Sequence, residues 1–129
     1  MATIKSFEEI EAWNRARALS IELFQILKNG HAKTDFALRD QVNRSIGSVM
    51  DNIAEGFDRS GTKEFISFLI IAKASNAETR SQLYRTMDRN YISPETFAEL
   101  KEKNEFLGNK IMAFLKYLKA SEFKGQRYR

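Results

Sequence analysis

Hydrophobic side chains recur every three or four residues through four long segments of the chain, and no stretch shows the period of two that marks a half-buried strand. The breaks between the segments are a few residues long and contain Asn29-Gly30, Ser60-Gly61 and Ser93-Pro94. Segments of roughly 22 to 27 residues joined by such short breaks predict an all-α fold, an antiparallel up-down-up-down four-helix bundle.

Residues that cap or stop helices predict the ends of the four segments. Serine, threonine and aspartate satisfy the free N–H groups of a first turn, proline is tolerated there, and glycine allows the left-handed stop. The predicted boundaries are a Ser6/Glu9 capping box and Asn29-Gly30 for the first helix, Thr34 or Asp35 and Gly56 for the second, Thr62 as cap and Asp88 for the third, and Ser93 as cap before Pro94 for the fourth.

The first half of the third segment is apolar on every side, because only Ser67 interrupts the run from Phe65 to Ala72. A helix of a monomeric bundle buries one face, so this run predicts a second buried surface at a subunit interface. The fourth segment carries a heptad-like apolar seam whose one polar position is Asn104. Such a residue is expected to fix the packing register.

Composition and charge narrow the class of protein. A chain of 129 residues without cysteine predicts one domain with no disulfide. The N-terminal residues lack the apolar core of a signal peptide, and no apolar run reaches the roughly 18 residues of a membrane helix, so we expect a cytoplasmic protein that makes no use of a membrane.

The net charge of +4 resides in residues 116–129, which carry five basic side chains and one acidic one. We therefore divide the chain into a bundle over 1–120 and a basic C-terminal tail over 121–129 that resembles a flexible arm.

The usual constellations of metal and nucleophilic chemistry are missing from the sequence. The one histidine, His31, follows Gly30 in a predicted turn, where a solvated loop residue is expected, and there is no cysteine. Gly61-Thr62-Lys63 superficially resembles a phosphate-binding loop but lacks the strand that precedes such a loop. We predict no metal, no cofactor and no enzyme.

Two rows of polar side chains at helical spacing could meet between the second and third helices. One interpretation is that they satisfy each other and set the packing register; the other is a buried site with Glu55 and Glu78 as acids. The rows are Gln41, Ser45, Ser48, Asn52 and Glu55 on the second helix and Ser75, Asn76, Glu78, Thr79 and Gln82 on the third. Phe65 and Phe68 join them as candidate packing or interface residues.

Basic side chains with aromatic neighbours form the second candidate feature. Cations hold phosphate backbones and aromatic rings stack on unpaired bases, although helix charges often form only a solvated, ion-paired surface. The candidate nucleic-acid-binding residues are Lys73, Arg80, Tyr84, Arg85 and Arg89 on the third helix and Lys119, Lys124, Arg127 and Arg129 at the C-terminal end.

The segment Asn52-Ile-Ala-Glu-Gly56, followed by Phe57 and by Ala72-Lys-Ala-Ser75 with Glu78, resembles the four-helix-bundle family encoded in intervening sequences of bacterial 23S ribosomal RNA genes. The resemblance extends to Trp13 and to residues 41–48, where Asn43 and Ser45 stand in place of a basic residue and an alanine that the family usually has. It implies a homopentamer with no assigned catalysis. It also extends to the pentameric accessory protein of diversity-generating retroelements, which binds a reverse transcriptase and its RNA.

The leading hypothesis is a non-enzymatic, oligomeric helical bundle that binds RNA or a ribonucleoprotein through cations. The alternative is a structural or adaptor protein whose assembled ring binds a protein partner. An enzyme site at Glu55 and Glu78 is the third hypothesis.

Overall fold

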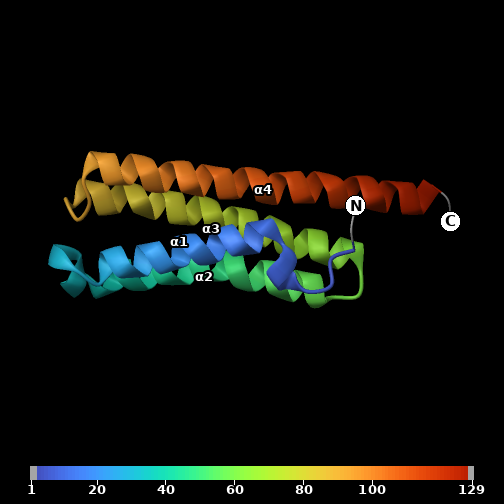
Figure 1. Cartoon of the computed structure of the whole chain (residues 1–129), viewed down its shortest axis with the longest axis horizontal. Helices are drawn as coiled ribbons and strands as arrows, with labels where there is room; N and C mark the ends of the chain where they lie inside the picture. The colour runs from blue at the N-terminus through green and yellow to red at the C-terminus, as the bar shows by residue number, and fades with distance from the viewer. Residues whose placement is uncertain (1–2, 128–129) are drawn as a thin grey trace.

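The computed structural model describes the backbone of residues 3–127 and the side chains of residues 3–123. Over this range the chain is helical, with no strand, and consecutive long helices run antiparallel (Figure 1). The predicted all-α four-helix bundle is therefore confirmed. The elements are the short 3-10 helix η1 (Phe7–Glu9), α1 (Glu11–Leu27), the 3-10 helix η2 (Gly30–Thr34), α2 (Phe36–Asp58), α3 (Thr62–Asp88) and α4 (Pro94–Arg127).

The predicted boundaries agree with the structure at most helix ends and differ at two starts. The Ser6/Glu9 capping box caps the start of η1 rather than the start of α1. The reason is that the backbone at Ile10 is extended and separates η1 from α1, which begins at Glu11. Gly61, not Thr62, occupies the cap position of α3. Asp35 caps α2 by accepting the N–H of Leu38 at 3.2 Å, and Gly30 has the positive φ of 60° expected after α1.

The C-terminal segment is also different from the predicted flexible arm. Helix α4 continues without a break to Arg127 and projects past the ends of the other helices (Figure 1). The segment contains no proline, and its lysines lie at the C-terminal end of a helix, where the macrodipole favours positive charge. Arg129 lies outside the described residues, and Lys124 and Arg127 lie outside the described side chains.

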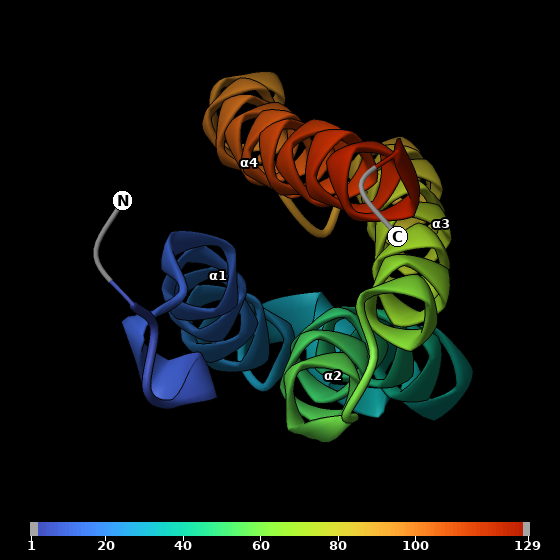
Figure 2. The ribbon, with the colours of Figure 1, turned by 90° about the vertical axis from the view of Figure 1, so that its right-hand side faces the viewer.

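The core lies along the bundle axis and is made of the predicted apolar seams. The α2–α3 and α3–α4 pairs pack most extensively. Among neighbouring long helices, α1 and α4 have the least contact, and this side of the bundle is the most open (Figure 2). The largest fully buried side chains are Leu23, Leu27, Leu38, Ile46, Ile53, Leu69, Leu83, Leu100, Leu107, Ile111, Val42 and Val49.

The apolar half of α3 does not bury all of its faces within one chain. Phe65, Leu69 and Ala72 point into the core, but Ile70 and Ile71 are each 49% exposed. Packing within one chain therefore leaves part of this run uncovered as exposed apolar surface.

Candidate nucleic-acid interface

Part of the polar row of α2 contacts part of the polar row of α3. Ser45 Oγ lies 2.7 Å from both Thr79 Oγ1 and Gln82 Oε1. One level along, Ser48 Oγ lies 2.8 Å from Ser75 Oγ. Since these groups satisfy each other and the small serines allow close helix approach, the rows set the packing of α2 on α3.

The structure does not bring Glu55 and Glu78 together. Glu55 is exposed on α2 and pairs with Arg59 at 2.9 Å. Glu78 is exposed on α3 and accepts from Gln82 Nε2 at 3.4 Å. The Ser45–Thr79 contact places the two carboxylates about nine residues apart along the bundle, or roughly 14 Å at 1.5 Å per residue. The described residues therefore show no paired acids in a buried site.

Three other residues of the predicted packing set have internal partners. Asn52 Nδ2 donates to the carbonyl oxygen of Ser48 at 2.8 Å. Phe65 is 8% exposed and packs on Phe114 with ring centroids 5.3 Å apart, so it belongs to the core. Phe68 is half-buried, with the Arg59 guanidinium 5.1 Å from its ring centre.

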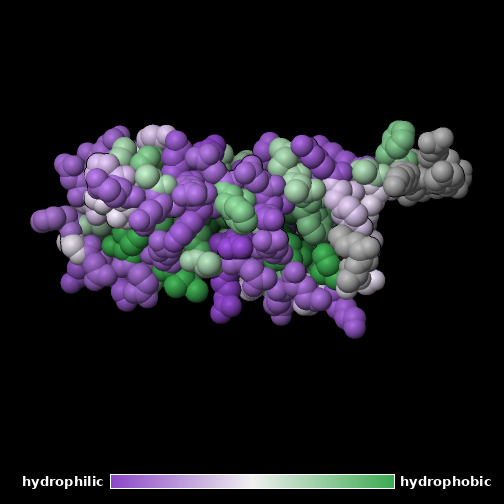
Figure 3. Space-filling view, turned by 45° about the horizontal axis from the view of Figure 1, so that its top comes forward, coloured by the Kyte–Doolittle hydropathy of each residue, from purple (hydrophilic) through white to green (hydrophobic). Residues whose placement is uncertain are grey.

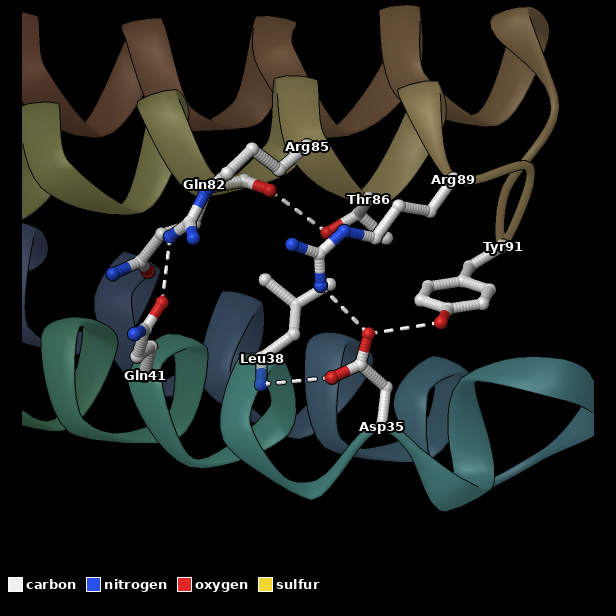
Figure 4. Close-up of polar contacts among 8 residues, drawn as sticks. All are labelled: Asp35, Leu38, Gln41, Gln82, Arg85, Thr86, Arg89 and Tyr91. Carbon is white, nitrogen blue, oxygen red and sulfur yellow. Dashed lines mark hydrogen bonds and ion pairs between the residues drawn. The ribbon is translucent and has the colours of Figure 1, made fainter.

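The predicted basic set of α3 divides between two sides of the helix. Arg85 and Arg89 reach toward α2, where Arg85 donates to Gln41 Oε1 at 2.6 Å and Arg89 to Asp35 Oδ2 at 2.7 Å (Figure 4). These two arginines tie helices together, which sequence spacing alone did not indicate. Lys73, Arg80 and Tyr84 lie on the other side, against α4.

Asp35 is the centre of a clamp that joins the start of α2 to the α3–α4 connection (Figure 4). Its Oδ2 accepts the Tyr91 hydroxyl at 2.8 Å as well as Arg89, while its Oδ1 accepts the N–H of Leu38. The hydrogen bond from Tyr91, then that from Leu38, and the charge and hydrogen bond of Arg89 hold the pKa of Asp35 below its usual 3.8. The same carboxylate raises the pKa of Tyr91 above 10.0.

Asp35→Asn is expected to lower stability at pH 7, because asparagine keeps the helix cap but removes the charge that faces Arg89 and Tyr91. The pKa of Asp35 is lower in the folded protein than the value of about 3.9 expected in the unfolded chain. Its ionised form therefore contributes its full stability at a pH above the unfolded-state pKa, and this contribution is lost as the pH falls through the folded-state pKa. The difference from wild type in urea midpoint should therefore shrink between pH 7 and pH 3.

Asp40→Asn is the matched control, since among the described residues the Asp40 carboxylate forms one ion pair, with Arg44 on the exposed surface of α2. We expect this variant to change the urea midpoint little at either pH. A deficit of Asp35→Asn that stayed the same from pH 7 to pH 3 would contradict the clamp.

A shallow groove of about 550 Å³ runs between α3 and α4. Its cations are Lys73 and Arg80, and Glu105 at its rim is paired with Lys101 at 3.8 Å. Tyr84 continues the α3 side, packing on Phe97 with centroids 4.7 Å apart while 42% of it stays exposed. The apolar part of the lining is Ile70, Ala74, Ala77 and Met112.

The same surface continues along α4 toward its C-terminal end. Lys116, Lys119 and Phe123 follow Met112 at four, seven and eleven residues, spacings that repeat one helix face. Phe123 is 65% exposed. We call the groove together with this extension the α3–α4 face. Lys116 and Met112 were not among the predicted binding residues, although their spacing to Lys119 was a signal for them.

The second groove lies on the open side of the bundle, between α1 and α4, and measures about 630 Å³. Figure 3 shows hydrophobic side chains at the bottom of this furrow between hydrophilic margins. Ala18, Leu19 and Phe106 line it together with the acidic Glu22, Glu99 and Glu102. Lys103 pairs with Glu22 at 2.7 Å, which leaves the other two carboxylates without an ion pair among the described residues.

Two further observations concern chemistry and membranes. In residues 3–123, no three histidine or carboxylate side chains gather in a group able to hold a metal ion. None of the helices in the described part of the chain is both long enough and apolar enough to span a bilayer.

The fold and its surfaces define a four-helix-bundle protein with one open side and a cationic face along α3 and α4. The family model of the 23S rRNA-intervening sequence proteins matches residues 8–113, so the chain belongs to this family. A solved structure from Bacteroides thetaiotaomicron, described as a protein with unknown function from the S23 ribosomal protein family, is similar with a TM-score of 0.74. That match has 20% identity and covers 81% of this chain and 95% of the other, so it shows the shared fold. No curated protein matches the sequence significantly.

Proposed function

We propose that this protein is a non-enzymatic, oligomeric bundle of the cytoplasm that binds RNA or a ribonucleoprotein through the α3–α4 face and the basic end of α4. One observation carries the proposal. Lys73, Arg80, Lys116 and Lys119 lie on this face, and none of them forms an ion pair with a carboxylate of the described residues. Unpaired cations in a row are available to phosphate groups, and membership of a family named for 23S rRNA genes supports RNA as the polyanion.

Binding of ribosomal RNA fragments over a salt series tests this function. Each phosphate contact contributes about 0.7 to the slope of log affinity against log salt on a single strand, so Lys73→Gln/Arg80→Gln should lower the slope by about 1.4. Truncation after Leu118, the last buried side chain in the described part of α4, should weaken binding to every RNA sequence. The control is Arg15→Gln/Arg44→Gln, whose arginines are ion-paired elsewhere. A protein without affinity even at about 50 mM salt would overturn the proposal.

Self-association is the second part of the proposal, with the homopentamer implied by the family as its expected size. The support is Ile71, because a monomer leaves its side chain 49% exposed and, unlike Ile70, it does not line the α3–α4 groove. Ile71→Asp should dissociate the oligomer in light scattering, since a buried unpaired carboxylate is costly. Ser81→Asp adds the same charge at an exposed polar position ten residues further along α3 and serves as control. A wild-type protein that is monomeric at micromolar concentration would contradict self-association.

The α1–α4 groove favours one alternative, an adaptor that binds a protein partner. Its apolar floor and its unpaired Glu99 and Glu102 fit a basic amphipathic helix. A bound protein that survives nuclease and high salt, and that Phe106→Asp releases, would favour this function. Retention of the same protein by Phe106→Asp would exclude the groove as its binding site.

A further inference from the structure

The register between α3 and α4 allows the charges of the α3–α4 face to be placed along the bundle axis. Three contacts link residues at the same level: Tyr84 with Phe97, Asn76 with Asn104, and Phe65 with Phe114. In each pair the two residue numbers sum to between 179 and 181. A residue n of α3 therefore lies at the same level along the bundle axis as residue 180 − n of α4.

Placed in this way, the cations form a single file. Arg80 lies level with position 100 of α4 and Lys73 with position 107, and Lys116 and Lys119 follow on α4 itself. An exposed aromatic ring lies at each end of this line of cations. Tyr84, at the level of Phe97, lies at one end, and Phe123 lies at the other. The distance from position 97 to position 123 is about 39 Å at 1.5 Å per residue.

The surface between the cations contains an apolar strip, and the carboxylate in the groove lining, Glu105, is paired with Lys101 at 3.8 Å. Ile70, Ala74 and Ala77 of α3 face Met112 of α4 across the groove, and Ile70 is 49% exposed. Tyr84 and Phe123 are 42% and 65% exposed. A strip of apolar and aromatic surface inside a line of cations offers contacts to the flat faces of bases as well as to phosphates.

Single-stranded and duplex RNA differ in what they can place on such a strip. A duplex keeps its bases stacked inside an A-form helix and presents phosphates and 2′-hydroxyl groups, so rings and an apolar groove gain nothing from it. A single strand has one phosphate backbone, which matches one file of cations, and unpaired bases that stack on aromatic side chains.

We infer that the α3–α4 face binds single-stranded RNA in preference to duplex RNA, with phosphates along Arg80, Lys73, Lys116 and Lys119 and bases against Tyr84, Phe123 and the groove between them. This inference rests on the proposed RNA-binding function. It adds the form of the RNA and assigns the aromatic side chains a part in affinity that is separate from charge.

The test is fluorescence anisotropy of an unstructured RNA of about 12 nucleotides and of a blunt duplex of the same length, over a salt series. The single strand should bind at least about tenfold more tightly than the duplex at equal salt. Phe123→Ala should weaken single-strand binding by about tenfold and leave the salt slope unchanged, whereas Lys73→Gln/Arg80→Gln should lower the slope. Tyr84→Ala is expected to act like Phe123→Ala, with a thermal melt to check that loss of the Phe97 contact leaves the bundle folded.

Phe36→Ala is the matched control, because Phe36 is 70% exposed at the start of α2 and away from the α3–α4 face. Phe123 lies beyond Leu118, the last buried side chain in the described part of α4, so Phe123→Ala should not affect folding. It therefore keeps the test valid if Tyr84→Ala unfolds. Duplex binding equal to or tighter than single-strand binding, or a Phe123→Ala protein that binds like Phe36→Ala, would overturn the inference and leave RNA binding intact. Absence of binding to both RNAs would overturn the proposed function as well.

Discussion

Gly56→Ala is expected to lower the free energy of unfolding by about 1–2 kcal/mol. A Cβ atom at position 56 would lie 2.7 Å from Phe68 Cβ and 2.9 Å from Phe65 Cδ1. Phe68 Cβ is bound to the backbone, and Phe65 packs in the core, so neither neighbour yields without moving α3. Overpacking of this kind typically costs about 1–3 kcal/mol, and the better helix propensity of alanine offsets up to about 1 kcal/mol of it.

Gly47→Ala is the matched control on the same helix and should have the opposite sign. No side-chain or neighbouring-helix atom lies within 4 Å of a Cβ built at position 47, so alanine gains its helix propensity of about 0.5–1 kcal/mol without a clash. Urea denaturation followed by circular dichroism measures both variants. Equal or higher stability of Gly56→Ala would show that α2 and α3 tolerate a wider separation than their contact indicates.

Asn104→Ala is expected to lower the free energy of unfolding by about 2 kcal/mol. Asn104 is fully buried, and its Nδ2 donates to the backbone oxygen and to Oδ1 of Asn76, each at 2.9 Å. Asn76 Nδ2 donates back to the Asn104 carbonyl at 3.0 Å. Removal of the Asn104 side chain leaves a small cavity and a buried Asn76 Oδ1 without its donor. The mutation also removes Asn104 Oδ1, a buried oxygen without a hydrogen-bond partner among residues 3–123, and this offsets part of the loss of stability.

A double-mutant cycle separates the pair from the packing around it. Asn76→Ala/Asn104→Ala should cost less than the sum of the two single variants by about 1 kcal/mol, because the second truncation removes a group that the first left unpaired. Asn109→Ala, at an exposed position of the same helix, should stay within about 0.5 kcal/mol of wild type. Strict additivity of the two single variants would mean that the amides contribute only through volume.

Much of this fold follows from local pattern. The helical periodicity, the cap at Asp35, the stop at Gly30 and the start at Pro94 all depend on residues within one turn of each other, so a sequence shows them. The Ser6/Glu9 capping box, by contrast, was predicted to start the first long helix and does not. Its carboxylate does accept the N–H of Ser6 at 2.9 Å, but the extended backbone at Ile10 confines the effect to one 3-10 turn.

The candidate site was less accessible to sequence reasoning, because it depends on which helix each charge faces. Arg85 and Arg80 are five residues apart on one helix, yet Arg85 binds Gln41 of α2 while Arg80 lines the groove against α4. Helical spacing places two residues on the same or different sides of a helix. It does not say which neighbour lies on each side.

Periodicity, capping and composition are local properties, so four amphipathic helices, an apolar seam on each and an excess of positive charge at the C-terminal end can be inferred without a structure. The pairing of Asn76 with Asn104, the ion pair between Arg89 and Asp35, and the alignment of Lys73 and Arg80 with Lys116 and Lys119 cannot. Those outcomes depend on the rotation and register of one helix against the next. The close approach at Gly56 and the hydrogen bonds between buried polar groups select that rotation and register, and both require residues distant in the chain to meet.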